Sequence, residues 1–233
     1  MRECGPISTS TRRSRARRIS AVAFAAIVAM LLPASAMAVT ATDTTQFSVN
    51  PGTLVFGTAP DVPNLPPLNL NGQAQTLNGQ MNNFTVSDAT GSGSGWNLTV
   101  NGDNGGGKSP VLAQYCPPAS APCGSDPAGY VAAGSTLPAN SLTLNSSGAS
   151  FTQQSGSGAT PPTHSCNSGC FVDTAPASPT KIVSAASGAG MGTFQATNFS
   201  TTSVALAAPS TIRALPANEI YHVDLVWSLN TGP

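Results

Sequence analysis

Four cysteines and one histidine have the residue types for metal binding or for cross-linking. The cysteines stand as two local pairs, Cys116 with Cys123 and Cys166 with Cys170, and His164 precedes the second pair. Structural zinc sites commonly use a C-x2-C spacing, which the spacings C-x6-C and C-x3-C do not match. In an oxidising compartment four cysteines form up to two disulfides, with three possible pairings. We favour the two local disulfides, since each pair lies in one loop rich in Pro and Gly, over a zinc site helped by His164, and we predict no metal or cofactor.

Two short motifs suggest enzyme chemistry, and neither has the context that the chemistry needs. Residues 102–109 (GDNGGGKS) match the phosphate-binding pattern G-x4-G-K-S, but Pro110 disfavours the helix that must follow. The segment 88–91 (DATG) has an extra residue compared with the Asp-Thr-Gly of aspartic proteases, and it has no second copy to pair with. Scattered acids leave a hydrolytic carboxylate pair open as an alternative, but none is singled out. We therefore predict that the protein is not an enzyme.

The two tryptophans each stand two residues before a leucine, as Trp96-Asn97-Leu98 and Trp227-Ser228-Leu229. Residues i and i+2 of a strand share a face, so each triplet presents an indole beside a leucine. An indole on the apolar face of an alternating strand is commonly a core residue. The other interpretation is an exposed contact site, so Trp96, Leu98, Trp227 and Leu229 are candidates for either the core or the binding surface.

These triplets and their surroundings resemble the WxL domain of Gram-positive surface proteins. The resemblance covers about residues 44–233 and is carried by five segments: Thr53–Gly57, Phe84–Val100, Gly190–Phe194, Ser203–Pro209 and Tyr221–Leu229. It implies a β-rich domain that attaches non-covalently to the bacterial cell wall, through peptidoglycan, at the cell surface. It also implies possible assembly with co-secreted surface proteins, so a structural or adhesive subunit that binds such partners is the alternative function.

The elements that must position these residues are short strands, because apolar residues repeat with a period of two and turn formers separate them. The fold class that we predict is a single all-β, antiparallel, sandwich-like domain with two long disulfide-bearing loops, Gly102–Gly129 and Gln154–Pro179. Turns are expected at sites such as Asn71-Gly72 and Asn78-Gly79. The expected strands are Gln46–Asn50, Gly52–Phe56, Asn83–Asp88, Trp96–Val100, Ser141–Leu144, Phe151–Gln153, Lys181–Ala185, Thr193–Thr197, Ser203–Leu206 and Ile220–Leu229.

The N-terminus has the pattern of a secretory signal peptide. Six arginines lie within residues 2–18, an apolar run spans 19–32, and residues 36–38 (AMA) end the segment with small residues. The apolar run is shorter than the roughly 20 residues that span a bilayer, which favours cleavage over anchoring. We predict a signal peptide at 1–38 and one β domain at 39–233, with no membrane span after cleavage.

The charges divide at the same point. Of the nine Lys and Arg residues only Lys108, Lys181 and Arg213 follow residue 38, against eight acidic residues, so the net charge there is 3 − 8 = −5. A domain with so few cations cannot neutralise a phosphate backbone, which disfavours nucleic-acid binding. The same scarcity disfavours attraction to anionic lipid.

Cleavage after Ala38 gives the first testable prediction. N-terminal sequencing of the protein recovered from the surface of an expressing bacterium should begin at Val39, because Ala36 and Ala38 supply the small residues that a signal peptidase requires. Recovery of protein that still carries residues 19–32 would contradict this and indicate an uncleaved anchor.

Overall fold

A computed structural model describes residues 44–154 and 159–233. The chain divides into two units, Met1–Phe47 and Ser48–Pro233, and all the strands of the described residues lie in the second. The predicted signal peptide, 1–38, lies outside the described residues. In the described ranges no helix is long and apolar enough to cross a membrane.

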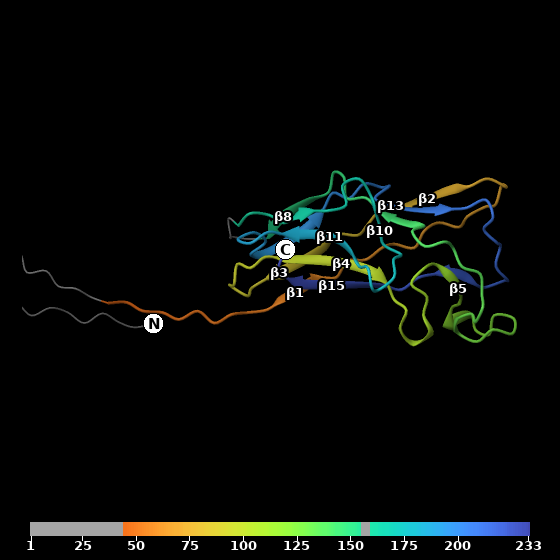
Figure 1. The fold of residues 1–233 in the computed structure, drawn as a ribbon, viewed down its shortest axis with the longest axis horizontal. Helices are drawn as coiled ribbons and strands as arrows, with labels where there is room; N and C mark the ends of the chain where they lie inside the picture. The colour runs from red at the N-terminus through yellow and green to blue at the C-terminus, as the bar shows by residue number, and fades with distance from the viewer. Residues whose placement is uncertain (1–43, 155–158) are drawn as a thin grey trace, which may run out of the picture. The chain divides into compact units, whose positions relative to one another are not determined.

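Two four-stranded antiparallel sheets form a sandwich. Sheet A has the order β1–β3–β12–β8, with the bounds Leu54–Thr58, Phe84–Asp88, Gly192–Thr197 and Ser150–Gln154. Sheet C has the order β15–β4–β11–β9, with the bounds Leu225–Thr231, Trp96–Gly102, Thr180–Ala185 and Thr163–His164. The edge strands β1 and β15 contact each other, as do β8 and β9, so the two sheets lie face to face (Figure 1).

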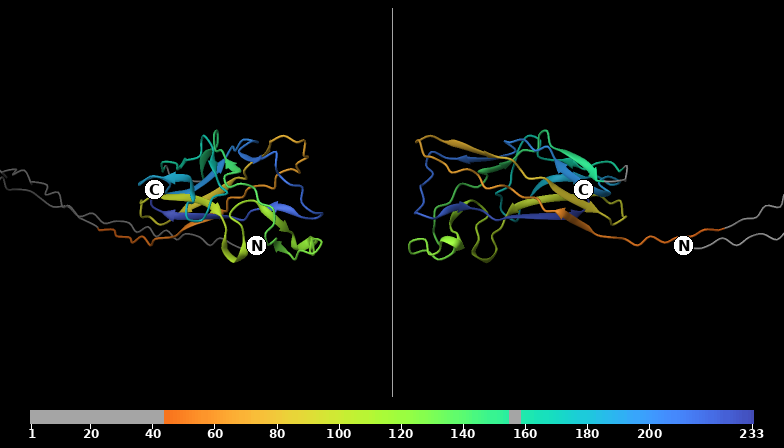
Figure 2. Two further views of the ribbon diagram at one scale, coloured as in Figure 1. Left: turned by 45° about the vertical axis from the view of Figure 1, so that its right-hand side comes forward. Right: turned by 180° about the vertical axis from the view of Figure 1, so that it is seen from behind.

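Two further sheets, one of four strands and one of three, extend this sandwich. Sheet B has the order β10–β7–β13–β2, with the bounds Cys170–Phe171, Leu142–Leu144, Val204–Ala208 and Gln75–Gly79. Sheet D has the order β14–β5–β6, with the bounds Ile220–His222, Ala113–Cys116 and Gly129–Tyr130. Figures 1 and 2 show β2 and β13 on one side of this part of the unit and β5 on the other. Every strand ladder is antiparallel, and the predicted all-β fold class is confirmed.

The core follows the period-two pattern of the strands. In β3 the side chains of Phe84 and Val86 are fully buried, while Thr85 and Ser87 between them are partly exposed. In β4 the residues Trp96, Leu98 and Val100 are likewise buried. All five belong to one hydrophobic cluster. Each such side chain stabilises the fold by about 1.5–3 kcal/mol relative to exposure, so this cluster holds the sandwich together.

Most expected strands exist with ends moved by one or two residues, but the prediction for Gln46–Asn50 is wrong. This segment belongs to no strand, and Phe47 and Val49 are 89% and 77% exposed. Alternation makes a strand only where a neighbouring strand supplies hydrogen bonds. The predicted turn at Asn78-Gly79 is also wrong, because both residues lie in β2 and pair with β13.

The expected strand Ile220–Leu229 is two strands, β14 in sheet D and β15 in sheet C. The break lies at Val223 and Asp224. Around the break the backbone N–H of Asp224 donates to Tyr130 Oη at 3.1 Å, and its carbonyl accepts from the N–H of Asp103 at 2.8 Å. Because Tyr130 and Asp103 satisfy the backbone N–H and C=O of Asp224, this residue pairs with neither sheet. The chain can therefore pass from the ladder of β14 to that of β15 here.

The cysteine regions contain more regular structure than expected from the sequence. The disulfides join Cys116 to Cys123 and Cys166 to Cys170, the pairs favoured from the sequence. The interpretation of 102–129 and 154–179 as loops is only partly correct, because β5, β9 and β10 lie within them. These short strands have too few residues for an alternating pattern to reveal them.

The ring of His164 lies among aromatic side chains beside the second disulfide. It stacks on Phe151 at a centroid distance of 4.4 Å and meets the ring of Phe199 edge-on at 5.7 Å. Among the described residues neither of its buried ring nitrogens has a hydrogen-bond partner. Burial therefore lowers the pKa of His164 from 6.5 to about 4, so the imidazole is neutral at pH 7.

This environment predicts an acid-dependent loss of stability. Unfolding exposes His164, whose pKa then returns to about 6.5, so the unfolded state gains a proton before the folded state as the pH falls. The free energy of unfolding should fall between pH 6.5 and 4, by at most about 3 kcal/mol from this group. Urea unfolding at several pH values should show a smaller loss in His164→Phe than in the wild type. An equal loss in both would mean that His164 is solvated.

Candidate functional site

The two Trp-x-Leu triplets lie on neighbouring strands of sheet C. In the antiparallel pair of β4 and β15, Trp96 faces Thr231, Leu98 faces Leu229, and Val100 faces Trp227. Residues directly opposite each other have side chains on the same face. Both indoles and both leucines therefore lie on the inner face of one sheet.

Trp96 is a core residue. Its side chain is 0% exposed, and its indole N–H donates to the carbonyl oxygen of Gly190 at 3.1 Å. Gly190 has a φ of +71°, and a Cβ there would lie 2.6 Å from Trp96 Nε1. Only glycine allows the backbone to approach the indole this closely, so the first triplet and the segment Gly190–Phe194 form one packing unit.

Trp227 has a different environment. It is half-buried and lines a groove of about 830 Å³, together with Tyr221, Val223 and Leu225 of the same segment. These residues also pack against the core. Within the second triplet, Leu229 packs against the core but does not line the groove, whereas Trp227 does both.

The opposite wall of the groove comes from sheet B and from the proline-rich segment 60–68. Leu77, Leu142 and Leu206 contribute from β2, β7 and β13. The segment 60–68 passes close over β2, where a Cβ on Gly79 would lie 3.0 Å from Leu65 Cδ2. The glycine that the sequence pattern marked as a turn residue instead allows this close approach.

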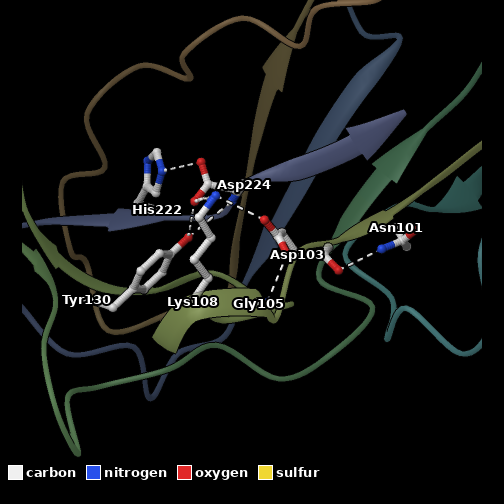
Figure 3. Close-up of polar contacts among 8 residues, drawn as sticks. Asn101, Asp103, Gly105, Lys108, Tyr130, His222 and Asp224 are labelled. Atoms are coloured by element: carbon white, nitrogen blue, oxygen red, sulfur yellow. Dashed lines mark hydrogen bonds and ion pairs between the residues drawn. The ribbon is translucent and has the colours of Figure 1, made fainter. Parts of the chain in front are cut away.

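A polar cluster surrounds Asp224 (Figure 3). Asp224 also lines the groove. Its carboxylate lies 3.2 Å from His222 Nε2, 3.5 Å from Lys108 Nζ and 3.2 Å from Tyr130 Oη. Partial burial raises the pKa of Asp224, but the hydrogen bond and charge of His222 and the charge of Lys108 outweigh it and hold the pKa below the ordinary value. Asp224 is therefore an anion at neutral pH and is not suited to act as a general acid.

The segment that resembles a phosphate-binding loop belongs to this cluster. Lys108 Nζ lies 2.9 Å from Asp103 Oδ2, and the loop, which contains the short 3-10 turn Gly105–Gly107, is followed by the strand β5 and not by a helix. The hydrogen bond to Asp103 raises the pKa of Lys108. Lys108 contacts two carboxylates, and no helix follows the loop to direct its N-terminus at a phosphate. The geometry is therefore not that of a nucleotide site.

Three rings complete the cluster. The ring of Tyr115 stacks on His222 at a centroid distance of 4.4 Å and meets the ring of Tyr130 at 5.2 Å. Burial and the charge of Asp224 raise the pKa of Tyr130, so its hydroxyl stays protonated and can donate to the carboxylate. Partly exposed ion pairs add little to stability, and the main effect of this cluster is to fix the chain where β14 passes to β15.

The sequence indicated both tryptophans but not the groove. Two of its three acidic residues, Asp61 and Glu219, are isolated in the chain, and the segment 60–68 carries no strand or helix pattern. The four prolines among the nine residues of that segment were the available signal of an extended wall. In the part of the chain that is described, no group of three or more His, Cys, Asp or Glu residues could hold a metal ion.

Comparison with protein families decides the identification. The model of the WxL domain, described as a surface cell wall-binding domain, matches residues 44–233. The chain belongs to the WxL domain family. No curated protein and no solved structure matched the chain. In this WxL domain the first Trp-x-Leu triplet lies in the core, and the second lies between the core and the groove.

The different burial of the two tryptophans predicts different effects of their removal. Trp96→Ala should lower the free energy of unfolding by about 3–5 kcal/mol, since it leaves a large cavity and an unpaired carbonyl at Gly190. Trp227→Ala should cost roughly half as much, because that indole is only half-buried. Denaturant unfolding followed by circular dichroism measures both. Equal losses would contradict the assignment of Trp227 to the groove.

Proposed function

We propose that the protein is exported and attaches non-covalently to peptidoglycan, without catalysis, through the groove lined by Trp227. Family membership supports attachment to the cell wall. The observation that carries the choice of site is the placement of the second triplet: Trp227 of a wall-binding domain lines a groove of about 830 Å³. Tryptophan is among the residues that most often dominate binding energy at such positions.

The charge of the domain supports peptidoglycan over an anionic wall polymer. The net charge after residue 38 is −5, from three basic and eight acidic residues. Lys108 already contacts Asp103 and Asp224, so it does not attract an external anion. Teichoic acids carry a phosphate on each repeat, and a domain of this charge would repel them.

Sedimentation with purified sacculi tests the proposal. The purified protein should pellet with insoluble peptidoglycan, and it should still do so after acid extraction of the teichoic acids from the sacculi. Trp227→Ala should remain folded and lose at least about tenfold in affinity, as is usual for a central aromatic contact. The measurement is the bound fraction over a range of sacculus concentrations.

Val226→Ala is the matched control. Val226 is the neighbour of Trp227 on β15, but its side chain is exposed on the other face of the strand. This variant should bind as the wild type does. Protein that stays in the supernatant with both kinds of sacculi would overturn the proposal, and binding lost only on acid extraction would point to an anionic polymer.

A further inference from the structure

The walls of the groove are mainly aliphatic. Leu77, Leu142 and Leu206 line one side, and Val223 and Leu225 line the other together with Trp227. Sugar rings are bound by exposed aromatic faces and many polar side chains, whereas aliphatic walls suit alkyl groups. The walls therefore favour a ligand with small apolar side chains over a bare glycan.

Glu219 supplies a polar group in this apolar setting. The residue is 8% exposed and lines the groove. Its Oε2 accepts a hydrogen bond from Gln114 Nε2, while Oε1 has no partner among the described residues. Oε1 is closed to solvent, so a ligand donor reaches it only if the carboxylate turns toward the groove that Glu219 lines. No hydrogen bond from the described residues holds Oε1 in place, and a donor that met it there would form a strong interaction.

The other charged residues of the groove indicate which charged groups a matching ligand would carry. Asp61, Glu219 and Asp224 are acidic, and Arg213 is the single Lys or Arg residue among those that line it. The exposed Arg213 side chain has no hydrogen-bond or ion-pair partner within the ranges that the structure describes. A ligand with an amino group and a carboxylate would match Glu219 and Arg213, and a neutral sugar chain has neither.

From these features we infer that the groove recognises the peptide portion of peptidoglycan, through a primary ammonium group that donates to Glu219. This inference rests on the proposed function and deepens it. The stem peptides of peptidoglycan combine the required groups: small alanine side chains, a free amino group on the lysine side chain where it is not cross-linked, and carboxylates. The glycan then lies outside the groove and contributes no specific contact.

Chemical treatment of the ligand tests the inference without relying on any variant. Wild-type protein is sedimented with lysine-type sacculi, with the same sacculi after acetylation of their amino groups, and with glycan from which an amidase has removed the peptides. Binding of the soluble lysine-containing stem peptide is measured by calorimetry. Acetylation should lower affinity about tenfold or more, peptide-free glycan should not bind, and the soluble peptide should bind.

Two variants assign the ammonium contact. Glu219→Gln keeps a hydrogen-bonding side chain beside Gln114 but removes the charge, so it should bind untreated sacculi as weakly as the wild type binds acetylated sacculi. It should also be insensitive to acetylation. Asp126→Asn removes an acid that does not line the groove and should behave as the wild type. A Glu219→Gln variant that still loses affinity on acetylation would overturn the role of Glu219.

The outcomes separate this inference from the proposed function. Wild type that binds intact, acetylated and peptide-free material equally would overturn the inference and leave wall attachment intact. Wild type that binds the soluble peptide but no sacculi would support the groove's chemistry and overturn attachment to the wall. Failure to bind any of these ligands would overturn both.

Discussion

The hydrogen bond from the indole of Trp96 to the carbonyl of Gly190 is the contact on which the rest of the domain depends. It joins β4 of sheet C to the segment that leads into β12 of sheet A, so it crosses between the two sheets. A polar N–H buried in an apolar core is stable only with such a partner. The glycine is required because a side chain at position 190 would occupy the space of the indole ring. The first triplet therefore fixes the distance between the sheets.

The second triplet depends on this arrangement through strand pairing. β15 is the edge strand of sheet C and pairs with β4 over its whole length, from Leu225 opposite Gly102 to Thr231 opposite Trp96. A register shift of one residue would turn Trp227 away from the groove and bring Val226 inward. The buried face of β4 sets this register, since Leu98 and Val100 need Leu229 and Trp227 beside them. The packing of Trp96 in the core therefore sets the position of β4, and the pairing of β15 with β4 sets the position of Trp227.

The sequence predicted the parts of the fold that depend on local alternation and missed those that depend on distant partners. Phe84–Asp88 and Trp96–Gly102 were found because each buries one complete face. The strand at Gln75–Gly79 was missed because Asn78-Gly79 is a favourable turn dipeptide, and the packing of Leu65 and Pro63 against Gly79 could not be seen in the chain. Glu219 was missed for a similar reason, since its significance comes from burial beside Gln114, about a hundred residues earlier in the sequence. The tryptophans were recognised as a pair, but only the structure distinguishes their environments.

The transition from β14 to β15 links the core to the groove. Asp224 holds this point through Tyr130, His222 and Lys108, and the residues before and after it, Tyr221 to Trp227, line the groove. Because that segment is pinned at its centre and paired at both ends, a ligand meets a wall that is already ordered and little conformational entropy is lost on binding. A preordered site of modest affinity is sufficient for attachment to a polymer that presents the same chemical group on every repeat. A released molecule meets the next repeat at high local concentration and rebinds before it diffuses away. The non-covalent attachment that we propose would need many equivalent ligands in the wall more than one tight contact, and a short peptide repeated along each glycan strand would meet that requirement.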